Sequence, residues 1–392
     1  MIYQEPNLFP EDHAVLDLIR KQRETLKQYT QTNFRRWMGS LRRATFARAI
    51  QGSNSIEGFN ATFDEAIAAI ENEPPLDERT ETWLAISGYR AALTYIMQAA
   101  DDPYFEFSKQ FLKSLHFMMT GYDLNSRPGQ WRLGSIYVVS KKTNEALYEG
   151  PDVEKVDELI SELVDYLRLQ NDAPAPVRAA MAHLNLAMIH PFKDGNGRAA
   201  RALQTLVLAR EGLLHPVFSS IEEWLGRNTE EYYAVLAQMS DGKWNPACNT
   251  QAWIRFCLKA HYQQASTLVR RNEVYGILFD EISKIVERRR LHERTALPLF
   301  DAALGMRLTN ARYQKDAEVS QHAAGRDLKE LADADLLDPV GEKRGRYYVA
   351  GGELRSARER TAIKKKLPDP YELVAASSSK TADEATPRLP GL

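Results

Sequence analysis

Helical spacing of apolar residues is the feature that most limits how this chain can fold. Through most of the first 290 residues apolar side chains recur every three or four positions, as in VRAAMAHLNLAMI at 177–189 and in the run at 250–290. That spacing predicts amphipathic helices. One stretch differs, because apolar and polar residues alternate at 132–149 about a polar turn at 141–144. We therefore expect a mainly α fold with one inserted β-hairpin.

A second unit is expected from about residue 295. The sequence there predicts a short helix, a turn, a longer helix with Ser320 as N-cap, and two short strands. This is the element order of a small winged helix-turn-helix domain. The turn GEKRGRYY is basic, but the longer helix carries four acidic residues, a poor match to DNA phosphates. DNA binding and protein docking are both kept as hypotheses for this unit.

Composition narrows the class of protein. A hydrophobic content of 44% and a net charge of -2 are ordinary for a globular chain and give no pull toward nucleic acid or anionic membranes. The only cysteines are Cys248 and Cys257, so no disulfide framework is expected. The N-terminus has no signal-peptide pattern, and no apolar run is long enough to cross a bilayer. We expect a soluble cytoplasmic protein without a membrane partner.

The stretch HPFKDGNGRAAR, at 190–201, combines the parts of a phosphate site between two predicted helices. Two glycines flank Asn196 where the second helix begins, so backbone N–H groups can converge on an anion there. Arg198 and Arg201 lie three residues apart, which puts them on one side of the first helical turn. They could grip one polyphosphate together.

The same stretch supplies an acid and a base. Asp194 stands beside the phosphate loop, where Mg²⁺ prefers a carboxylate together with phosphate oxygens. His190 ends the incoming helix and has the ordinary pKa of a group that can take a proton from a hydroxyl. These residues together indicate transfer of a phosphate-containing group from a nucleotide. Neither a Walker motif nor the kinase motif set occurs.

The stretch resembles the Fic family motif HPFx(D/E)GNGRxxR at every defined position. That family transfers AMP from ATP to a Ser, Thr or Tyr hydroxyl of a protein. The resemblance, which covers roughly residues 40–260, implies ATP as substrate and Mg²⁺ as cofactor. It implies these roles: His190 as general base, Asp194 as Mg²⁺ ligand, Asn196 with the amides of Gly195 and Gly197 at the α-phosphate region, and Arg198 and Arg201 at the β- and γ-phosphates.

Two further segments resemble parts of the same family. The hairpin at 132–149 is similar to the flap that pairs with an extended segment of the target protein. The helix NTEEYYAVLAQM is similar to a segment whose first tyrosine, here Tyr232, borders the adenosine. Val139 and Ser140 on the hairpin are weaker candidates for the ATP pocket.

The segment SNSIEG, at 53–58, fits the family's inhibitory pattern (S/T)xxxE(G/N) with Ser53, Glu57 and Gly58. A carboxylate on Arg201 would occupy the guanidinium group that the γ-phosphate needs. The resemblance therefore implies a self-inhibited enzyme in which Glu57 pairs with Arg201. In some relatives the same glutamate assists removal of AMP from the target, so a de-AMPylase stays an alternative.

These inferences divide the chain into five parts. They are an N-terminal helical region (1–105), a Fic-type catalytic core (106–262), a linking helix (263–294), a winged-helix domain (295–352), and a basic segment followed by a tail without regular structure (353–392). Relatives with this order tend to self-associate, which makes a homodimer a further expectation. The competing hypotheses are a nucleotide-sensing DNA-binding regulator and a related transferase that uses the same site.

Overall fold

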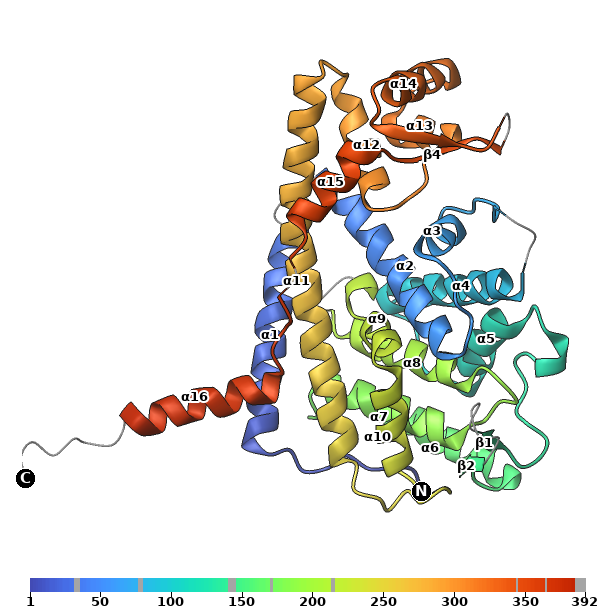
Figure 1. Ribbon diagram of the computed structural model, residues 1–392. Helices are drawn as coiled ribbons and strands as arrows, with labels where there is room; N and C mark the ends of the chain where they lie inside the picture. Colours follow the sequence, from blue (N-terminus) through green and yellow to red (C-terminus); the bar gives the residue numbers. More distant parts are fainter. Residues whose placement is uncertain are drawn as a thin grey trace, which may run out of the picture.

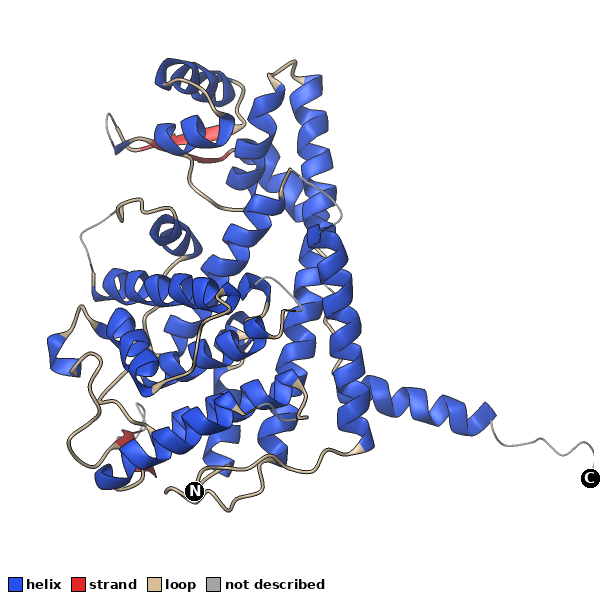
Figure 2. Cartoon of the chain, turned by 180° about the vertical axis from the view of Figure 1, so that it is seen from behind, coloured by secondary structure: helices blue, strands red, loops and turns tan. Residues whose placement is uncertain are grey.

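The computed structural model describes residues 1–31, 36–76, 80–139, 146–169, 172–212, 216–342, 345–363 and 365–384. The fold is mainly helical, as predicted, and it carries a short hairpin among the helices (Figures 1 and 2). The first helices are α1 (Pro10–Gln31), α2 (Met38–Ile56), α3 (Phe63–Ile70), α4 (Glu81–Asp101) and α5 (Lys109–Thr120). The hairpin strands are β1 (Tyr137–Val139) and β2 (Ala146–Glu149).

The remaining elements follow the hairpin. They are α6 (Val156–Arg168), α7 (Ala175–Ile189), α8 (Asn196–Arg210), α9 (Glu222–Arg227), α10 (Thr229–Gln238), α11 (Gln251–Arg288), α12 (Ala296–Ala303), α13 (Asn310–Ala317), α14 (Gln321–Asp333), β3 (Leu337–Val340), β4 (Tyr347–Ala350), α15 (Gly352–Thr361) and α16 (Pro370–Glu384). Short 3₁₀ turns lie at Leu124–Ser126, Val153–Lys155, Pro216–Phe218 and Glu293–Thr295.

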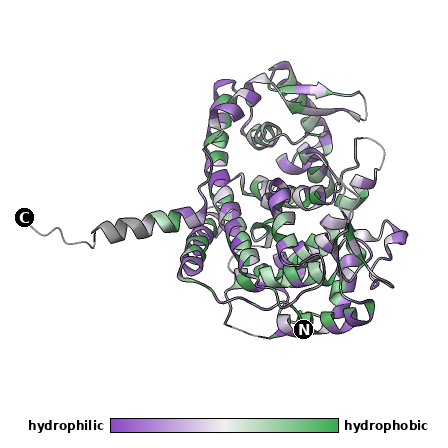
Figure 3. Cartoon of the chain, turned by 60° about the horizontal axis from the view of Figure 1, so that its bottom comes forward, coloured by the Kyte–Doolittle hydropathy of each residue, from purple (hydrophilic) through white to green (hydrophobic). Residues whose placement is uncertain are grey.

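One long helix joins the two ends of the molecule. The 38 residues of α11 run beside α1 and reach the C-terminal helices (Figure 1). The expected border at 262/263 therefore falls inside a continuous helix. Hydrophobic residues are frequent along the helices in the middle of the molecule (Figure 3), where α7 and α8 pack against each other and α8 contacts α4 and α5.

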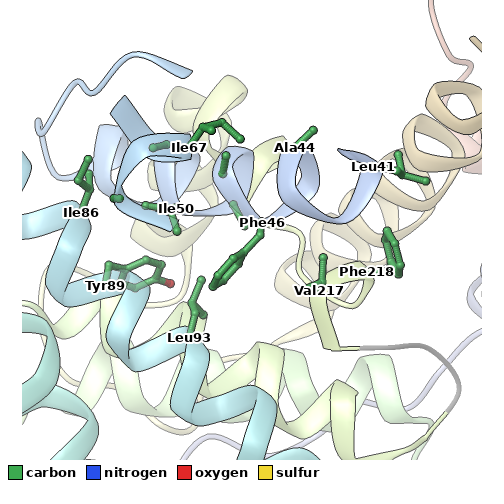
Figure 4. Packing of buried hydrophobic residues seen from close by; sticks show 14 of the residues in the cluster. Leu41, Ala44, Phe46, Ile50, Ile67, Ile86, Tyr89, Leu93, Val217 and Phe218 are labelled. Atoms are coloured by element: carbon green, nitrogen blue, oxygen red, sulfur yellow. The ribbon is translucent and has the colours of Figure 1, made fainter. Parts of the chain in front are cut away.

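Helix α2 is packed on two sides. Phe46 and Ile50 point toward Tyr89 and Leu93 of α4 in the core (Figure 4). On another side, Gly52 meets α9 so closely that a Cβ there would collide with the backbone carbonyl of Glu222. A glycine is therefore required at this crossing.

The C-terminal unit has the predicted order of helices and strands. α13 and α14 are followed by β3 and β4, which pair antiparallel with Leu337 opposite Ala350. Ser320 caps α14, since its Oγ accepts from the N–H of Ala323 at 3.3 Å. One acid of α14, Asp327, accepts from Arg294 at 2.7 Å and is part of the internal packing. The name winged helix stays a prediction, and the basic turn residues 343–344 lie outside the described residues.

The C-terminal segment differs from the expectation of an irregular tail. Residues 352–361 and 370–384 form α15 and α16, and α16 extends away from the rest of the molecule (Figures 1 and 2). The first turn of α16 is anchored by Tyr371, whose hydroxyl donates to Asp12 at 3.0 Å and whose ring lies 5.3 Å from the guanidinium of Arg255. Composition could not reveal this tertiary anchor. Residues 385–392 are outside the described part.

Within the described residues, every helix is either too short or too polar to cross a membrane.

Candidate functional site

The loop between α7 and α8 is built from left-handed backbone conformations. His190, the C-cap of α7, has φ 50° and ψ 57°, and Gly195, the N-cap of α8, has φ 75°. Glycine adopts this region without penalty, whereas a histidine there is uncommon and must be held by its surroundings. The result is a tight turn that brings the end of α7 close to the start of α8.

Two buried side chains hold this loop. The Asn196 amide bonds both the N–H and the carbonyl of Phe192, each at 2.9 Å. His116 of α5 stacks on the Phe192 ring with centroids 3.8 Å apart. Its Nδ1 accepts from the N–H of Gly129 at 2.9 Å, so Nε2 carries the proton and donates to the Asp194 carbonyl at 2.8 Å. That arrangement needs a neutral ring, and burial lowers the pKa of His116 to about 4.

His190 is oriented as a proton acceptor. Its Nδ1 lies 2.9 Å from the carbonyl oxygen of Ala187, which can only accept, so Nδ1 carries the proton and the neutral ring keeps a lone pair on Nε2. Burial lowers the pKa of His190, which favours this neutral form. The ring can therefore take a proton at Nε2 near neutral pH.

Arg132 ties the histidine to the base of the hairpin. Its Nε donates to the carbonyl of His190 at 3.0 Å, and its guanidinium also donates to the carbonyls of Gly134 and Pro151. The side chain is buried. The hairpin strands are thus fixed relative to the loop by one residue that precedes β1.

Arg201 is enclosed by the C-terminal end of α2. Its Nε donates to Oγ of Ser53 at 2.8 Å, and its Nη2 donates to the carbonyl of Ser53 at 2.9 Å and to Oε1 of Glu57 at 2.6 Å. The Arg201 side chain is only 1% exposed and the Glu57 side chain 25%, so water can reach this ion pair only from the glutamate side. The predicted pair between Glu57 and Arg201 is therefore present as a contact.

The Glu57 carboxylate also covers the start of α8. A Cβ at Gly197 would collide with Oε1 of Glu57, so the carboxylate lies directly over the glycine turn. Burial acts to raise the pKa of Glu57, but Arg201 outweighs it and lowers the pKa below its ordinary value. The glutamate is therefore an anion held over the helix N-terminus, where a phosphate would also be favoured.

Arg198 and Asp194 form the opposite side of the loop. Nη2 of Arg198 lies 3.2 Å from Oδ2 of Asp194, and its guanidinium stands 5.1 Å from the Phe59 ring. The Asp194 side chain is 57% exposed beside the glycine turn. A partly exposed carboxylate next to an anion-binding turn fits the donor set of Mg²⁺, which takes few protein ligands and completes its shell with phosphate and water.

Comparison with known proteins identifies this part of the chain. Residues 106–208 match the Fic/DOC family model. These residues form a Fic domain. The chain is 29% identical over 208 residues to protein adenylyltransferase fic-1 of Caenorhabditis briggsae, covering 52% of this chain and 38% of that protein. It is 27% identical over 208 residues to protein adenylyltransferase fic-1 of Caenorhabditis elegans, with the same coverage. The matched region thus spans well under half the length of these relatives.

Solved structures show the same fold. A Fic family protein from Desulfovibrio desulfuricans G20 superposes with a TM-score of 0.57 at 20% identity, covering 89% of this chain and 99% of that one. Fic-1 of Caenorhabditis elegans gives a TM-score of 0.52 at 23% identity, covering 66% of this chain and 72% of that one. At these identities the likeness establishes the fold alone.

The tyrosine assigned to the nucleoside pocket lies in the protein core. Tyr232 is 1% exposed, and its hydroxyl donates to Nε2 of His183 at 2.9 Å. His183 in turn contacts Gln204 of α8 at 2.5 Å. Tyr233, the residue after Tyr232, is 44% exposed. Its hydroxyl donates to the carbonyl of Ile56 at 3.3 Å, beside Glu57. Of the two tyrosines, Tyr233 is the one with surface available to a ligand.

The hairpin of the Fic domain is partly described. Val139 ends β1, where the register with β2 shifts, whereas Ser140 lies outside the described residues. The outer edge of β2 is occupied, since Glu149 forms a bridge with Lys243. Among the described residues no strand pairs with the outer edge of β1. Gly58, the last residue of the inhibitory pattern, has φ 95° and follows the C-cap of α2.

Sequence reasoning missed His116, Arg132 and Phe59. None of them lies in the quoted motif, and each acts on it from a distant segment. Only Arg132 had a usable signal, because an arginine at the first position of the predicted hairpin stands where a tether to a neighbouring loop could form. His116 sits on an ordinary amphipathic helix, so nothing in its spacing separates it from a packing residue.

Proposed function

We propose that this chain is a protein adenylyltransferase held in a low-activity state by Glu57. The observation that carries the proposal is the constellation at one loop: a neutral histidine with a free lone pair, a helix N-terminus covered by a carboxylate, and two arginines of α8 beside it. Relatives named protein adenylyltransferase support the same chemistry.

In the proposed reaction the hydroxyl oxygen of the target attacks the α-phosphorus of ATP. The bond between the α-phosphorus and the bridging oxygen breaks, and pyrophosphate leaves. Nε2 of His190 takes the hydroxyl proton as the new P–O bond forms. The glycine turn and Arg198 hold the phosphates, and Asp194 would hold Mg²⁺, which supplies positive charge to the phosphate chain.

Glu57 competes with the nucleotide for two features at once. It occupies the guanidinium of Arg201, and it covers the turn at Gly197. A nucleotide phosphate at this helix N-terminus would be displaced or repelled by the carboxylate. The contact between α2 and α8 therefore keeps basal transfer low, and its release is the activating step.

The outer edge of β1 is the proposed dock for the target. An extended segment added there would lie next to the loop, because Arg132 fixes the hairpin base to the carbonyl of His190. A second copy of this chain could supply that segment.

The test compares α-labelled with γ-labelled ATP in the Glu57→Gly variant. The proposal predicts that label from the α-position becomes attached to protein and that label from the γ-position does not. His190→Ala in the same background should abolish the transfer. Attachment of the γ-label would identify phosphoryl transfer instead, and equal labelling with and without His190 would remove that histidine as the base.

A further inference from the structure

A polar pocket lies between α2 and α9, away from the nucleotide loop. Its volume is about 320 Å³. Its wall carries three charged residues, Arg48 of α2 and Glu223 and Arg227 of α9. The pocket lies on the opposite side of α2 from Ser53 and Glu57. The last turns of α2 therefore line the pocket on one side and contact Arg201 on the other.

The charges at this pocket do not balance. Glu223 accepts from Nη2 of Arg227 and from Nη2 of Arg271, each at 2.6 Å, while Nε of Arg48 stands 3.9 Å away. Among the described residues, three guanidinium groups thus share one carboxylate. Arg48 and Arg227 are on the pocket wall and Arg271 of α11 reaches Glu223 from outside the lining, which leaves an excess of two positive charges around the pocket. The neighbouring Glu222 does not contribute, because its carboxylate accepts from Thr205 of α8.

Two nitrogens of the cluster are buried and donate to no acceptor among the described residues. They are Nε of Arg48 and Nη1 of Arg271. The side chains of Arg48 and Arg271 are 22% and 11% exposed, so bulk water screens them poorly. Burial lowers the pKa of Arg48, and the like charges of Arg271 and Arg227 lower it further. Such a cluster is destabilised unless an anion joins it.

We propose that this pocket binds a small phosphate-type oxyanion. A dianion matches the excess of two positive charges, and guanidinium groups bind phosphate oxygens with charge-assisted hydrogen bonds. The pocket opens beside Arg227, whose side chain is 58% exposed, so a ligand can enter from solvent. Arg48 and Arg227 belong to different helices, and a bound phosphate would connect α2 with α9.

The experiment is calorimetric titration of the full chain with pyrophosphate in the absence of ATP. Arg198→Gln is used as background, so that the nucleotide loop contributes little binding. We expect one saturable site, with affinity lowered at least about tenfold by Arg227→Gln and by Arg48→Gln, because each removes a charge-assisted contact. Inorganic phosphate should compete at the same site, which shows that the shared phosphate group is what is recognised.

Arg360→Gln is the matched control. Arg360 is also 58% exposed and also pairs with one glutamate, Glu281, but it lies outside the pocket. Its loss should leave the affinity unchanged. Absence of a saturable site, or an affinity that neither pocket variant changes, would overturn the proposal. Because no nucleotide is present, neither outcome depends on AMP transfer, and Arg227→Gln keeps the test valid if Arg48→Gln folds poorly.

Discussion

Arg198 and Arg201 lie three residues apart in α8 but have different surroundings. Arg201 is bound by Ser53 and Glu57, whereas Arg198 lies near Asp194 and Phe59. The sequence could place both arginines on one helical turn, since that follows from local spacing. Contact with residues 148 positions away could be expected only through the family resemblance.

Ser53 tests how tightly Arg201 is held. Ser53→Ala removes the Oγ that accepts from Nε of Arg201 and leaves a buried N–H without that partner, at a cost of about 1–3 kcal/mol. We expect a lower melting temperature and a basal transfer rate above wild type but below Glu57→Gly. Ser55→Ala is the control, because among the described residues the Ser55 hydroxyl bonds the helix carbonyl of Gly52 and no side chain. Equal effects from Ser53→Ala and Ser55→Ala would mean that the Ser53 hydroxyl does not hold Arg201 in place.

Glu222 gives a prediction about pH. Burial raises the pKa of this carboxyl from 4.5 to about 7. The folded state therefore holds a proton that the unfolded state releases, so stability falls as pH rises from about 4.5 to 7, by roughly 3 kcal/mol in total. Glu222→Gln cannot titrate and should be spared that loss. The melting temperature of Glu222→Gln minus that of wild type should be larger at pH 8 than at pH 5. A difference that is the same at both pH values would contradict the raised pKa of Glu222.

At the scale of elements, helix α2 packs in the hydrophobic core, lines the polar pocket, and contacts Arg201 at the nucleotide loop. It ends at Ile56, inside the segment SNSIEG that matches the inhibitory pattern. Its apolar face was predictable from periodicity. Its close crossing with α9 was not, because a glycine within a helix could equally mark a break or a tight contact. Only the neighbouring carbonyl of Glu222 decides between these two readings.

Gly52→Ala should therefore disturb both packing and regulation. The added methyl collides with the carbonyl of Glu222 and forces α2 away from α9, at a cost of about 1–3 kcal/mol. We expect a lower melting temperature and a raised basal transfer rate, because Glu57 moves with the helix. Gly39→Ala in the same helix has nothing within 4 Å and should be neutral or slightly stabilising. If Gly52→Ala behaved like Gly39→Ala, the close crossing would not constrain α2.

At the scale of the whole molecule, an ion cluster joins α2 to the C-terminal unit. Arg43 contacts Asp301 of α12 at 2.5 Å and Asp316 of α13 at 3.4 Å. Composition and periodicity predicted a second unit after residue 295, but they could not predict how it is docked. Because these contacts join residues more than 250 positions apart, no local sequence pattern predicts them.

Arg43→Met should destabilise the whole molecule. It leaves the fully buried Asp301 without its cation, and breaking a buried pair costs about 3–5 kcal/mol. Denaturant unfolding should show this loss, whereas Arg42→Met, at the exposed adjacent position, should leave stability nearly unchanged. Adding Asp301→Leu to Arg43→Met should restore part of the loss. Failure of the double variant to recover would mean that packing, not the unpaired charge, causes the effect.

The most direct test of the account is the mass of the intact protein after incubation with ATP and Mg²⁺. Wild type, Glu57→Gly, Glu57→Gly/His190→Ala and a control, Glu106→Gly, are compared with and without a mixture of candidate target proteins. Glu106 is a loop glutamate with a 79% exposed side chain. We expect an AMP-sized gain on the chain or on a target with Glu57→Gly, and little with wild type, the double variant or the control. A gain equal in wild type and Glu57→Gly, or one that persists without His190, would contradict it.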